Sequence, residues 1–390
     1  MSRRQERIGN AGRCIVMASS LALAAPWNGA DKNLARLLVT ADTRNCFVVQ
    51  TSMAKPWPDH VQPIRLPASG AMPTRRQKLR ALAFLLRHSP RADLVHIVAS
   101  LDSPSRWSGM AVRAATAARH TAVVHTIPSI GDRPADPRHF PGDISVVFSR
   151  HTEGRLTQRG IANVWRLSPP VDLDRLRVHG DVATLSRKLQ LGPRAVLYPA
   201  HYGPESGMGE MIAAFGQLDQ SLADAVLVLA CRARAGQHAP DEIQYLRDLA
   251  ARHRVVDRVR ILEHVDDMPA LIRACGVTAL VPARLASKMD LPLVVLEALA
   301  LERPVIICDR PPMNEALLGE CGFAVPFGDI GALAGTLSRL LADEALRARL
   351  GQAGRAAVAA ECHPDVVLAQ YQTIYDAAMR LRRKPVRRQS

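Results

Sequence analysis

The residue whose surroundings suggest chemistry most directly is Glu297, a single carboxylate inside an apolar run that ends at Leu301. On a helix, its neighbours three and four residues away are all leucine, valine or alanine, so the side chain does not face open water. An unpaired carboxylate in apolar surroundings is costly. Its partner is therefore either an internal cation or a ligand that offers hydroxyl donors, and both interpretations stay open at this point.

A glycine-rich segment follows a predicted strand at residues 195–199. It contains Gly203, Gly207 and Gly209 and leads directly into a predicted helix. Such a strand-to-helix turn exposes backbone N–H groups at the positive end of a helix, an arrangement that holds a pyrophosphate. The alternative is a plain turn whose glycines meet backbone requirements alone.

The helix that carries Glu297 is predicted to open at Asp290 as N-cap, with Pro292 in its first turn. Lys288 lies just ahead. A cation and a helix N-terminus are thus expected near one site, although Asp290 would repel a phosphate there.

Two further groups of residues are candidates in the first half of the chain. His125 lies at the carboxyl end of a predicted strand, which is the edge where sites form; the alternative is an ordinary core histidine. A loop before a helix contains Gly29, Asp31 and Lys32, which we expect either to contact an acceptor or a phosphate or, for Asp31, to cap the helix.

Several classes of protein are disfavoured by the sequence. It has no H-E-x-x-H motif, Walker loop, G-x-S-x-G elbow or Cys/His cluster, so no metal or other cofactor is expected. The net charge of +15 favours anionic partners, but aromatic residues make up only 4% of the chain and do not interleave with basic runs. We therefore expect no nucleic acid partner. Residues 75–80 and 380–388 instead suggest an anionic membrane surface.

The seven cysteines are scattered and odd in number, which indicates reduced thiols and a cytoplasmic protein. The basic residues favour an additional peripheral position on the inner face of the membrane. Residues 14–25 imitate a signal peptide, but we interpret them as a buried first strand that runs into a loop.

Short β-branched runs alternate with longer helical stretches along the whole chain, so we predict an α/β protein with two doubly wound Rossmann-like domains facing a cleft. The expected divisions are a first Rossmann-like domain at 1–172, a linker at 173–192, a second Rossmann-like domain at 193–365, and an amphipathic helix with a basic tail at 366–390. The predicted strands are 14–18, 46–51, 94–99, 122–126, 144–149 and 164–167 in the first half, and 195–199, 225–230, 259–262, 277–281, 304–309 and 322–325 in the second.

From about residue 144 to residue 378, the chain resembles the family 4 retaining glycosyltransferases of the GT-B fold. The segments that carry the likeness occur in the family's order and spacing: 147–160, 167–173, Gly207 with 212–215, 293–300, 303–306, Asn314 with Glu315, 322–329 and 340–343.

The resemblance implies transfer of a sugar from a nucleoside diphosphate donor to a glycan or lipid-linked acceptor, with retained configuration and without an obligatory metal. Surface polysaccharide synthesis is the expected context. Glu297 matches the family glutamate that binds the donor ribose, and His125 matches a histidine near the donor sugar. The turn from Gly203 to Gly209 matches the pyrophosphate-binding turn.

Departures from the family pattern affect the sugar and phosphate ends of the expected site. The family's arginine and lysine of the turn are replaced by His201 and Ser206. Met289 replaces the first of two family glutamates, so Asp290 and Lys288 are candidates for its carboxylate and for the missing cation. These changes leave two alternatives open: a GT-B scaffold that binds an active partner enzyme, and, less favoured, a sugar-nucleotide epimerase.

Overall fold

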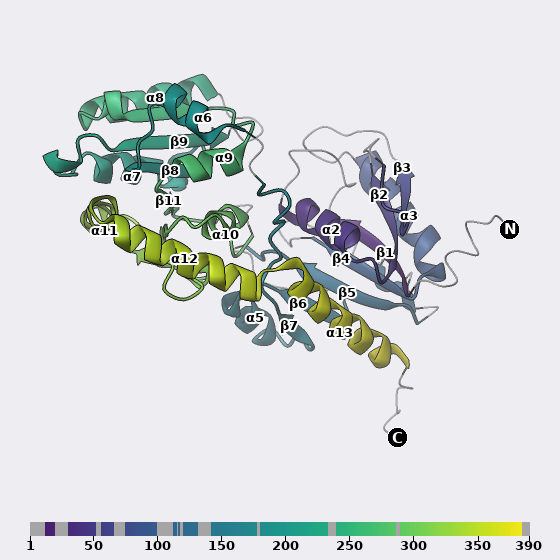
Figure 1. Ribbon diagram of the computed structural model, residues 1–390. Coiled ribbons are helices and arrows are strands. Elements are labelled where there is room, and N and C mark those ends of the chain that lie inside the picture. Colours follow the sequence, from purple (N-terminus) through teal and green to yellow (C-terminus); the bar gives the residue numbers. More distant parts are fainter. Residues whose placement is uncertain are drawn as a thin grey trace. The chain divides into compact units, whose positions relative to one another are not determined.

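The computed structural model describes residues 12–19, 30–51, 56–65, 75–99, 112–114, 116–117, 120–131, 142–177, 180–232, 239–285 and 289–383 (Figure 1). The chain divides into two compact units. The N-terminal unit consists of Met1–Pro170, Ser287–Asp290 and Pro364–Ser390, and the C-terminal unit consists of Val171–Ala286 and Leu291–His363.

The N-terminal unit is built on a seven-stranded parallel sheet. Its strands lie in the order β3 (Val61–Arg65), β2 (Cys46–Thr51), β1 (Cys14–Ser19), β4 (Leu94–Val98), β5 (Ala122–Ile127), β6 (Ile144–Val147) and β7 (Val164–Arg166). The sequence predicts six of them and misses β3. That strand is short and contains Pro63, which an edge strand tolerates because one of its sides needs no hydrogen-bond donors.

Helices cover both faces of this sheet: α2 (Ala30–Ala41), α3 (Arg75–His88), α5 (Arg150–Thr157) and α13 (Pro364–Arg383). Phe84 of α3 packs against Val95 on one face. The next residue, His96, points to the other face, where its Nδ1 lies 2.9 Å from the hydroxyl of Tyr375 in α13 and its Nε2 lies 2.8 Å from Thr126 Oγ1. Burial lowers the pKa of His96 to about 3, so these bonds involve a neutral ring.

The C-terminal unit repeats the same winding. Its strands lie in the order β10 (Val259–Leu262), β9 (Val226–Arg232), β8 (Ala195–His201), β11 (Val277–Leu280), β12 (Val305–Cys308) and β13 (Gly322–Val325), and all of them are parallel. The helices are α6 (Val182–Leu189), α7 (Met208–Phe215), α8 (Ala239–Arg252), α9 (Met268–Ala274), α10 (Leu293–Ala300), α11 (Ile330–Ala342) and α12 (Glu344–Glu361). The predicted fold class, with two doubly wound parallel sheets, is confirmed.

The division of the chain differs from the predicted one at two places. Residues 173–192, expected to be a linker, belong to the C-terminal unit, because α6 packs against α9 and the backbone N–H of Gly180 donates to Asp267 at 3.0 Å. The final helix, expected as a separate element from residue 366, belongs to the N-terminal unit. There the OH of Tyr371 also lies 2.9 Å from Thr126 Oγ1, and α13 runs beside β5 (Figure 1).

All seven cysteines carry free thiols. Among the helices of the described residues, none combines the length and the apolar character that a membrane span requires.

Candidate functional site

Glu297 lies in the second turn of α10 and is 8% exposed. Its Oε1 is 3.3 Å from a guanidinium nitrogen of Arg175, so the structure supplies an internal cation as partner. Burial raises the pKa of the Glu297 carboxyl, while Arg175 acts in the opposite direction and Asp172 adds to the increase. A single contact to one oxygen leaves most of the acceptor capacity of the carboxylate available, so both interpretations of its partner remain compatible.

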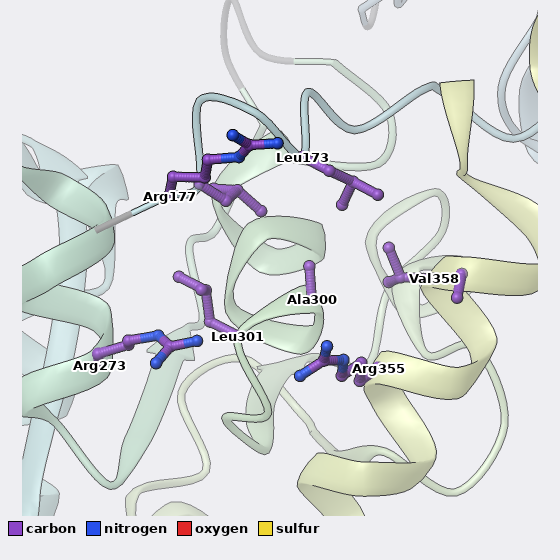
Figure 2. A pocket seen from close by; sticks show the side chains of 9 residues that line it. Leu173, Arg177, Arg273, Ala300, Leu301, Arg355 and Val358 are labelled. Atoms are coloured by element: carbon purple, nitrogen blue, oxygen red, sulfur yellow. The ribbon is translucent and has the colours of Figure 1, made fainter. Parts of the chain in front are cut away.

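A cavity of about 490 Å³ is lined by Ala300 and Leu301 at the end of α10 (Figure 2). These residues follow Glu297 by three and four positions, so they lie on the same side of the helix. Apolar side chains and three arginines line the cavity: Leu173, Leu176, Arg177, Arg273, Ala300, Leu301, Arg355, Val358 and Ala359. Arg177 and Arg355 are ion-paired with Asp174 and Glu302. The segment that carries Arg175 therefore borders open space rather than packing closely on α10.

The glycine-rich turn follows β8 at the point where the strand order of the sheet reverses, between β8 and β11. The strand continues to His201, two residues beyond the predicted end. Gly203 has φ +123° and Gly207 has φ +78°, and both values favour glycine. A Cβ on Gly207 would lie 2.3 Å from the carbonyl oxygen of Val281, so this turn presses against the loop after β11.

The side chain of Tyr198 holds the glycine-rich turn and the loop after β11 close together. Its buried hydroxyl donates to the carbonyl of Ser206 at 2.7 Å and accepts from the N–H of Val281 at 3.1 Å. Ser206 Oγ accepts from the N–H of Met208 at 3.3 Å, and Gly209 is the second residue of α7. The structure thus brings the predicted residues of this turn together, in one loop at the crevice where doubly wound sheets bind ligands.

Arginines from neighbouring loops approach the turn, where His201 and Ser206 replace the family's permanent cations. Arg284 Nε lies 3.7 Å from Glu205, and the N–H of Ala283 donates to the carbonyl of Glu205 at 3.0 Å. Arg310, which follows β12, donates to the carbonyl of Ala283 at 2.7 Å. Two exposed guanidinium groups are therefore connected to the glycine-rich turn, that of Arg284 directly through Glu205 and that of Arg310 through Ala283.

His125 lies within β5 and is buried in the N-terminal unit. Its Nε2 lies 3.1 Å from the carbonyl oxygen of Ala99, so this nitrogen donates. Burial lowers the pKa of His125 to about 4, which makes the ring neutral near pH 7. The single N–H of the neutral ring is directed at Ala99, so towards a substrate the ring offers no charge and only Nδ1 as an acceptor. Its catalytic role stays a prediction.

Asp290 was expected to cap the helix of Glu297, and this is wrong: Pro292 occupies the N-cap position and α10 begins at Leu293. The Oδ2 of Asp290 accepts instead from Ser149 Oγ and Thr152 Oγ1, both at 2.6 Å, within the N-terminal unit. Burial raises the pKa of Asp290, and these hydroxyls oppose the shift. Pro292 has no side-chain acceptor with which to cap the helix. The carboxylate of Asp290 does not cap it either, because it accepts from these two hydroxyl groups instead.

Asp290 also connects to the strand of His125. Its backbone N–H donates to the carbonyl of Pro128 at 2.9 Å, just after β5. Met289 beside it is buried, with 2% exposure. Asp290 therefore lies near the carboxyl end of β5, although its carboxylate is already bound by two hydroxyls.

The remaining candidates are placed only in part. Gly29 and Lys288 lie outside the described residues. Asp31 and Lys32 fall in the first turn of α2, which begins at Ala30, so Asp31 does not precede this helix as an N-cap would. Among the described residues, no group of three or more His, Cys, Asp and Glu side chains is arranged to hold a metal ion.

Two doubly wound parallel sheets, with a glycine-rich turn at the switch point of the second, define an α/β protein of the GT-B class. Residues 183–357 match the family "Glycosyl transferases group 1", so the predicted resemblance is confirmed at the level of this family over that part of the chain.

The chain is 33% identical over 267 residues to the D-inositol 3-phosphate glycosyltransferase of Salinispora arenicola, covering 60% of this chain and 58% of the relative. It spans about half to three-fifths of the length of the curated relatives it matches. Sucrose-phosphate synthase of Thermosynechococcus elongatus superposes with a TM-score of 0.72 at 20% identity, over 95% of this chain and 100% of that one. HepE of Anabaena, solved with UDP and glucose, gives a TM-score of 0.70 at 15% identity, over 94% and 100%.

Proposed function

We propose that this protein is a retaining glycosyltransferase that moves a sugar from a nucleoside diphosphate to a glycan or lipid-linked acceptor. The observation that carries the proposal is Glu297, an ionisable carboxylate kept inside the same unit as the glycine-rich turn although its burial is unfavourable. The family match of this unit and the UDP and glucose bound by HepE support it.

In this reaction, the bond between the anomeric carbon and the diphosphate oxygen breaks. The acceptor hydroxyl oxygen forms the new bond on the same face of the sugar, and its proton passes to the departing diphosphate. Glu297 accepts hydrogen bonds from the ribose hydroxyls, and the N–H groups around Gly207 contact the diphosphate. Arg284 and Arg310 neutralise the charge that develops there, which is usually the largest catalytic contribution. His125 contacts the donor sugar as a neutral ring whose Nδ1 accepts a hydrogen bond from a sugar hydroxyl.

The setting we propose is polysaccharide or lipid-linked glycan synthesis in the cytoplasm, with peripheral attachment to an anionic membrane surface. The net charge of +15 supports the attachment. No nucleic acid partner or cofactor is part of the proposal.

The test begins with a thermal-shift screen of the purified chain against nucleoside diphosphates and nucleotide sugars, because a ligand that binds the folded state raises the unfolding midpoint. We expect one nucleotide series to stabilise the wild type and the Glu297→Gln variant to lose most of that gain. Glu320→Gln is the matched control, since Glu320 lies in an exposed ion pair of the same unit. The absence of stabilisation by every nucleotide, together with unchanged behaviour of Glu297→Gln, would rule the proposal out.

A second candidate function is a GT-B scaffold without transferase activity that serves as the binding partner of an active enzyme. The observation that favours it is the buried Met289 at a family glutamate position, next to an Asp290 carboxylate that hydroxyls already occupy. Turnover with any activated sugar and a suitable acceptor would exclude the scaffold. Conversion of a sugar nucleotide without an acceptor would instead favour an epimerase.

A further inference from the structure

Arg175 is the only cation recorded within ion-pair distance of Glu297 in the described part of the chain, with 3.3 Å between its guanidinium and Oε1. The two side chains differ in their surroundings. That of Glu297 is 11% exposed, whereas that of Arg175 is 43% exposed. The carboxylate of this pair has lost most of its hydration, whereas the guanidinium remains partly hydrated. The ion pair therefore matters more for the stability of the charged Glu297 than for that of Arg175.

The backbone around Arg175 is fixed so that the guanidinium can reach α10. The Arg175 N–H donates to Asp172 Oδ1 at 3.1 Å, and the Leu176 N–H donates to the carbonyl of Leu173 at 3.2 Å, which forms a tight turn. Val171 is buried, and its N–H donates to the carbonyl of Cys362 at 2.9 Å. With anchors on both sides, the turn holds Arg175 against Glu297, although the cavity beside it leaves room for the side chain to adjust.

We infer that Arg175 is a positioning residue for donor binding: it holds Oε1 of an ionised Glu297 and leaves Oε2 to accept hydroxyl groups of the nucleotide ribose. This inference rests on the proposed function. An ionised carboxylate accepts hydrogen bonds with about four lone-pair sites, and one guanidinium contact at Oε1 leaves the others for hydroxyl donors. Charge-assisted hydrogen bonds of this kind are also stronger than those to a neutral acid.

The charged groups that face Glu297 act in opposite directions. Arg175 lowers the pKa of the carboxyl, while burial and Asp172 raise it. Loss of Arg175 leaves only the two raising influences, so the acid becomes protonated at higher pH. A protonated Glu297 has fewer acceptor sites for the ribose, and donor affinity then declines at a higher pH than in the wild type.

The alternative is that Arg175 merely stabilises the fold. A structural ion pair with a half-exposed partner contributes little to stability, and its loss lowers the unfolding midpoint slightly without altering ligand affinity or its pH dependence. Only the positioning role therefore predicts that replacing Arg175 changes the affinity for the ligand and the pH dependence of that affinity.

The experiment measures binding of UDP, GDP and ADP by calorimetry between pH 5 and pH 8, using the tightest of the three for the variants. We expect Arg175→Gln to weaken binding about five- to tenfold at pH 7 and to move the acidic decline of affinity to higher pH. Arg175→Lys keeps a cation and should remain within about threefold of the wild type. Arg349→Gln, which breaks the exposed pair with Glu320, is the matched control and should change nothing.

Glu297→Gln supplies the baseline, because the phosphate of the ligand titrates in the same pH range. In this background, Arg175→Gln should have no further effect on affinity. Wild-type affinity and pH dependence in Arg175→Gln, or an undiminished loss in the Glu297→Gln background, would overturn the inference while leaving the proposed function intact. If Arg175→Gln does not fold, Arg175→Met, which removes the charge and keeps an unbranched side chain, decides by the same pH profile. Failure of all three nucleotides to bind the wild type would refute the proposed function itself.

Discussion

Replacing Gly207 by alanine tests whether the glycine-rich turn is held in one conformation. Gly207 has φ +78°, and a Cβ there would lie 2.3 Å from the carbonyl oxygen of Val281 and 2.4 Å from the hydroxyl of Tyr198. Contacts below 3.0 Å require a shift, and here one partner is backbone while the other is a fully buried tyrosine with two hydrogen bonds.

The expected loss of stability is the sum of two contributions. The left-handed conformation costs a non-glycine residue about 1–2 kcal/mol. Moving the turn away from Val281 breaks at least one hydrogen bond of Tyr198, and an unsatisfied buried group costs about 1–3 kcal/mol. We therefore expect Gly207→Ala to reduce the free energy of unfolding by about 2–5 kcal/mol and to abolish nucleotide binding.

Urea unfolding followed by circular dichroism measures this change, with two glycines of the same unit as controls. Gly209 lies in α7, where a Cβ would meet only Leu249 at 3.5 Å, and Gly335 lies in α11 with nothing within 4 Å. Alanine at either position should be neutral or stabilise the unit by up to about 1 kcal/mol, because alanine favours the helix. A Gly207→Ala protein that unfolds within 1 kcal/mol of the wild type and still binds nucleotide would refute this reasoning.

Four further perturbations have definite expected outcomes. Glu297→Gln should raise the unfolding midpoint of the ligand-free protein at pH 7 by roughly 1–3 °C. The reason is that burial raises the folded-state pKa of the Glu297 carboxyl, so the ionised carboxylate reduces stability above that pKa. A second unfolding scan near pH 4, where the carboxyl is protonated, should show no such gain. Tyr375→Phe leaves Nδ1 of buried His96 without its hydroxyl partner and should reduce the free energy of unfolding by about 1–3 kcal/mol, whereas the exposed Tyr245→Phe should be neutral; equal midpoints would contradict the assigned bond. Arg310→Gln should lower kcat about tenfold in a transfer assay with an unchanged circular dichroism spectrum, and an unaltered kcat would assign the charge neutralisation elsewhere. Flotation with anionic liposomes should decrease as salt rises from 0.05 to about 0.5 M, and salt-insensitive binding would exclude an electrostatic attachment.

The sequence is a good guide to the fold because the strands of both sheets are short apolar runs with clear breaks. Twelve of the thirteen strands in the described residues were predicted near their observed positions. The exception, β3, combines Pro63 with polar residues and depends on pairing with β2 rather than on its own pattern. Helix starts are less predictable, as α10 shows: an aspartate before a proline suggests a cap, yet Asp290 has better hydrogen-bond donors in Ser149 and Thr152.

The candidate site was predictable where function depends on local sequence and not where it depends on tertiary contacts. The turn around Gly207 and the apolar surroundings of Glu297 follow from residues close in sequence. Arg175 was missed because it reaches Glu297 only after a distant segment folds across α10, and no pattern near either residue signals the pair. The role of Tyr198 was missed for the same reason: a tyrosine in a buried strand usually suggests packing alone.

These two parts of the site do not support function equally. Packing alone explains Gly207, because the contact with Val281 requires a glycine whether or not a phosphate binds there. No packing requirement explains Glu297: a glutamine or methionine would fill the same space on α10 without a buried charge, and the chain instead keeps a carboxylate together with an arginine to hold it ionised. At position 289, by contrast, the chain has a buried methionine, and this apolar side chain avoids a second buried carboxylate next to Asp290. The side chain that reduces stability thus lies at the expected ribose contact, and nucleotide affinity is for this reason the measurement that best tests whether this unit binds a donor, while turnover separates a transferase from a scaffold.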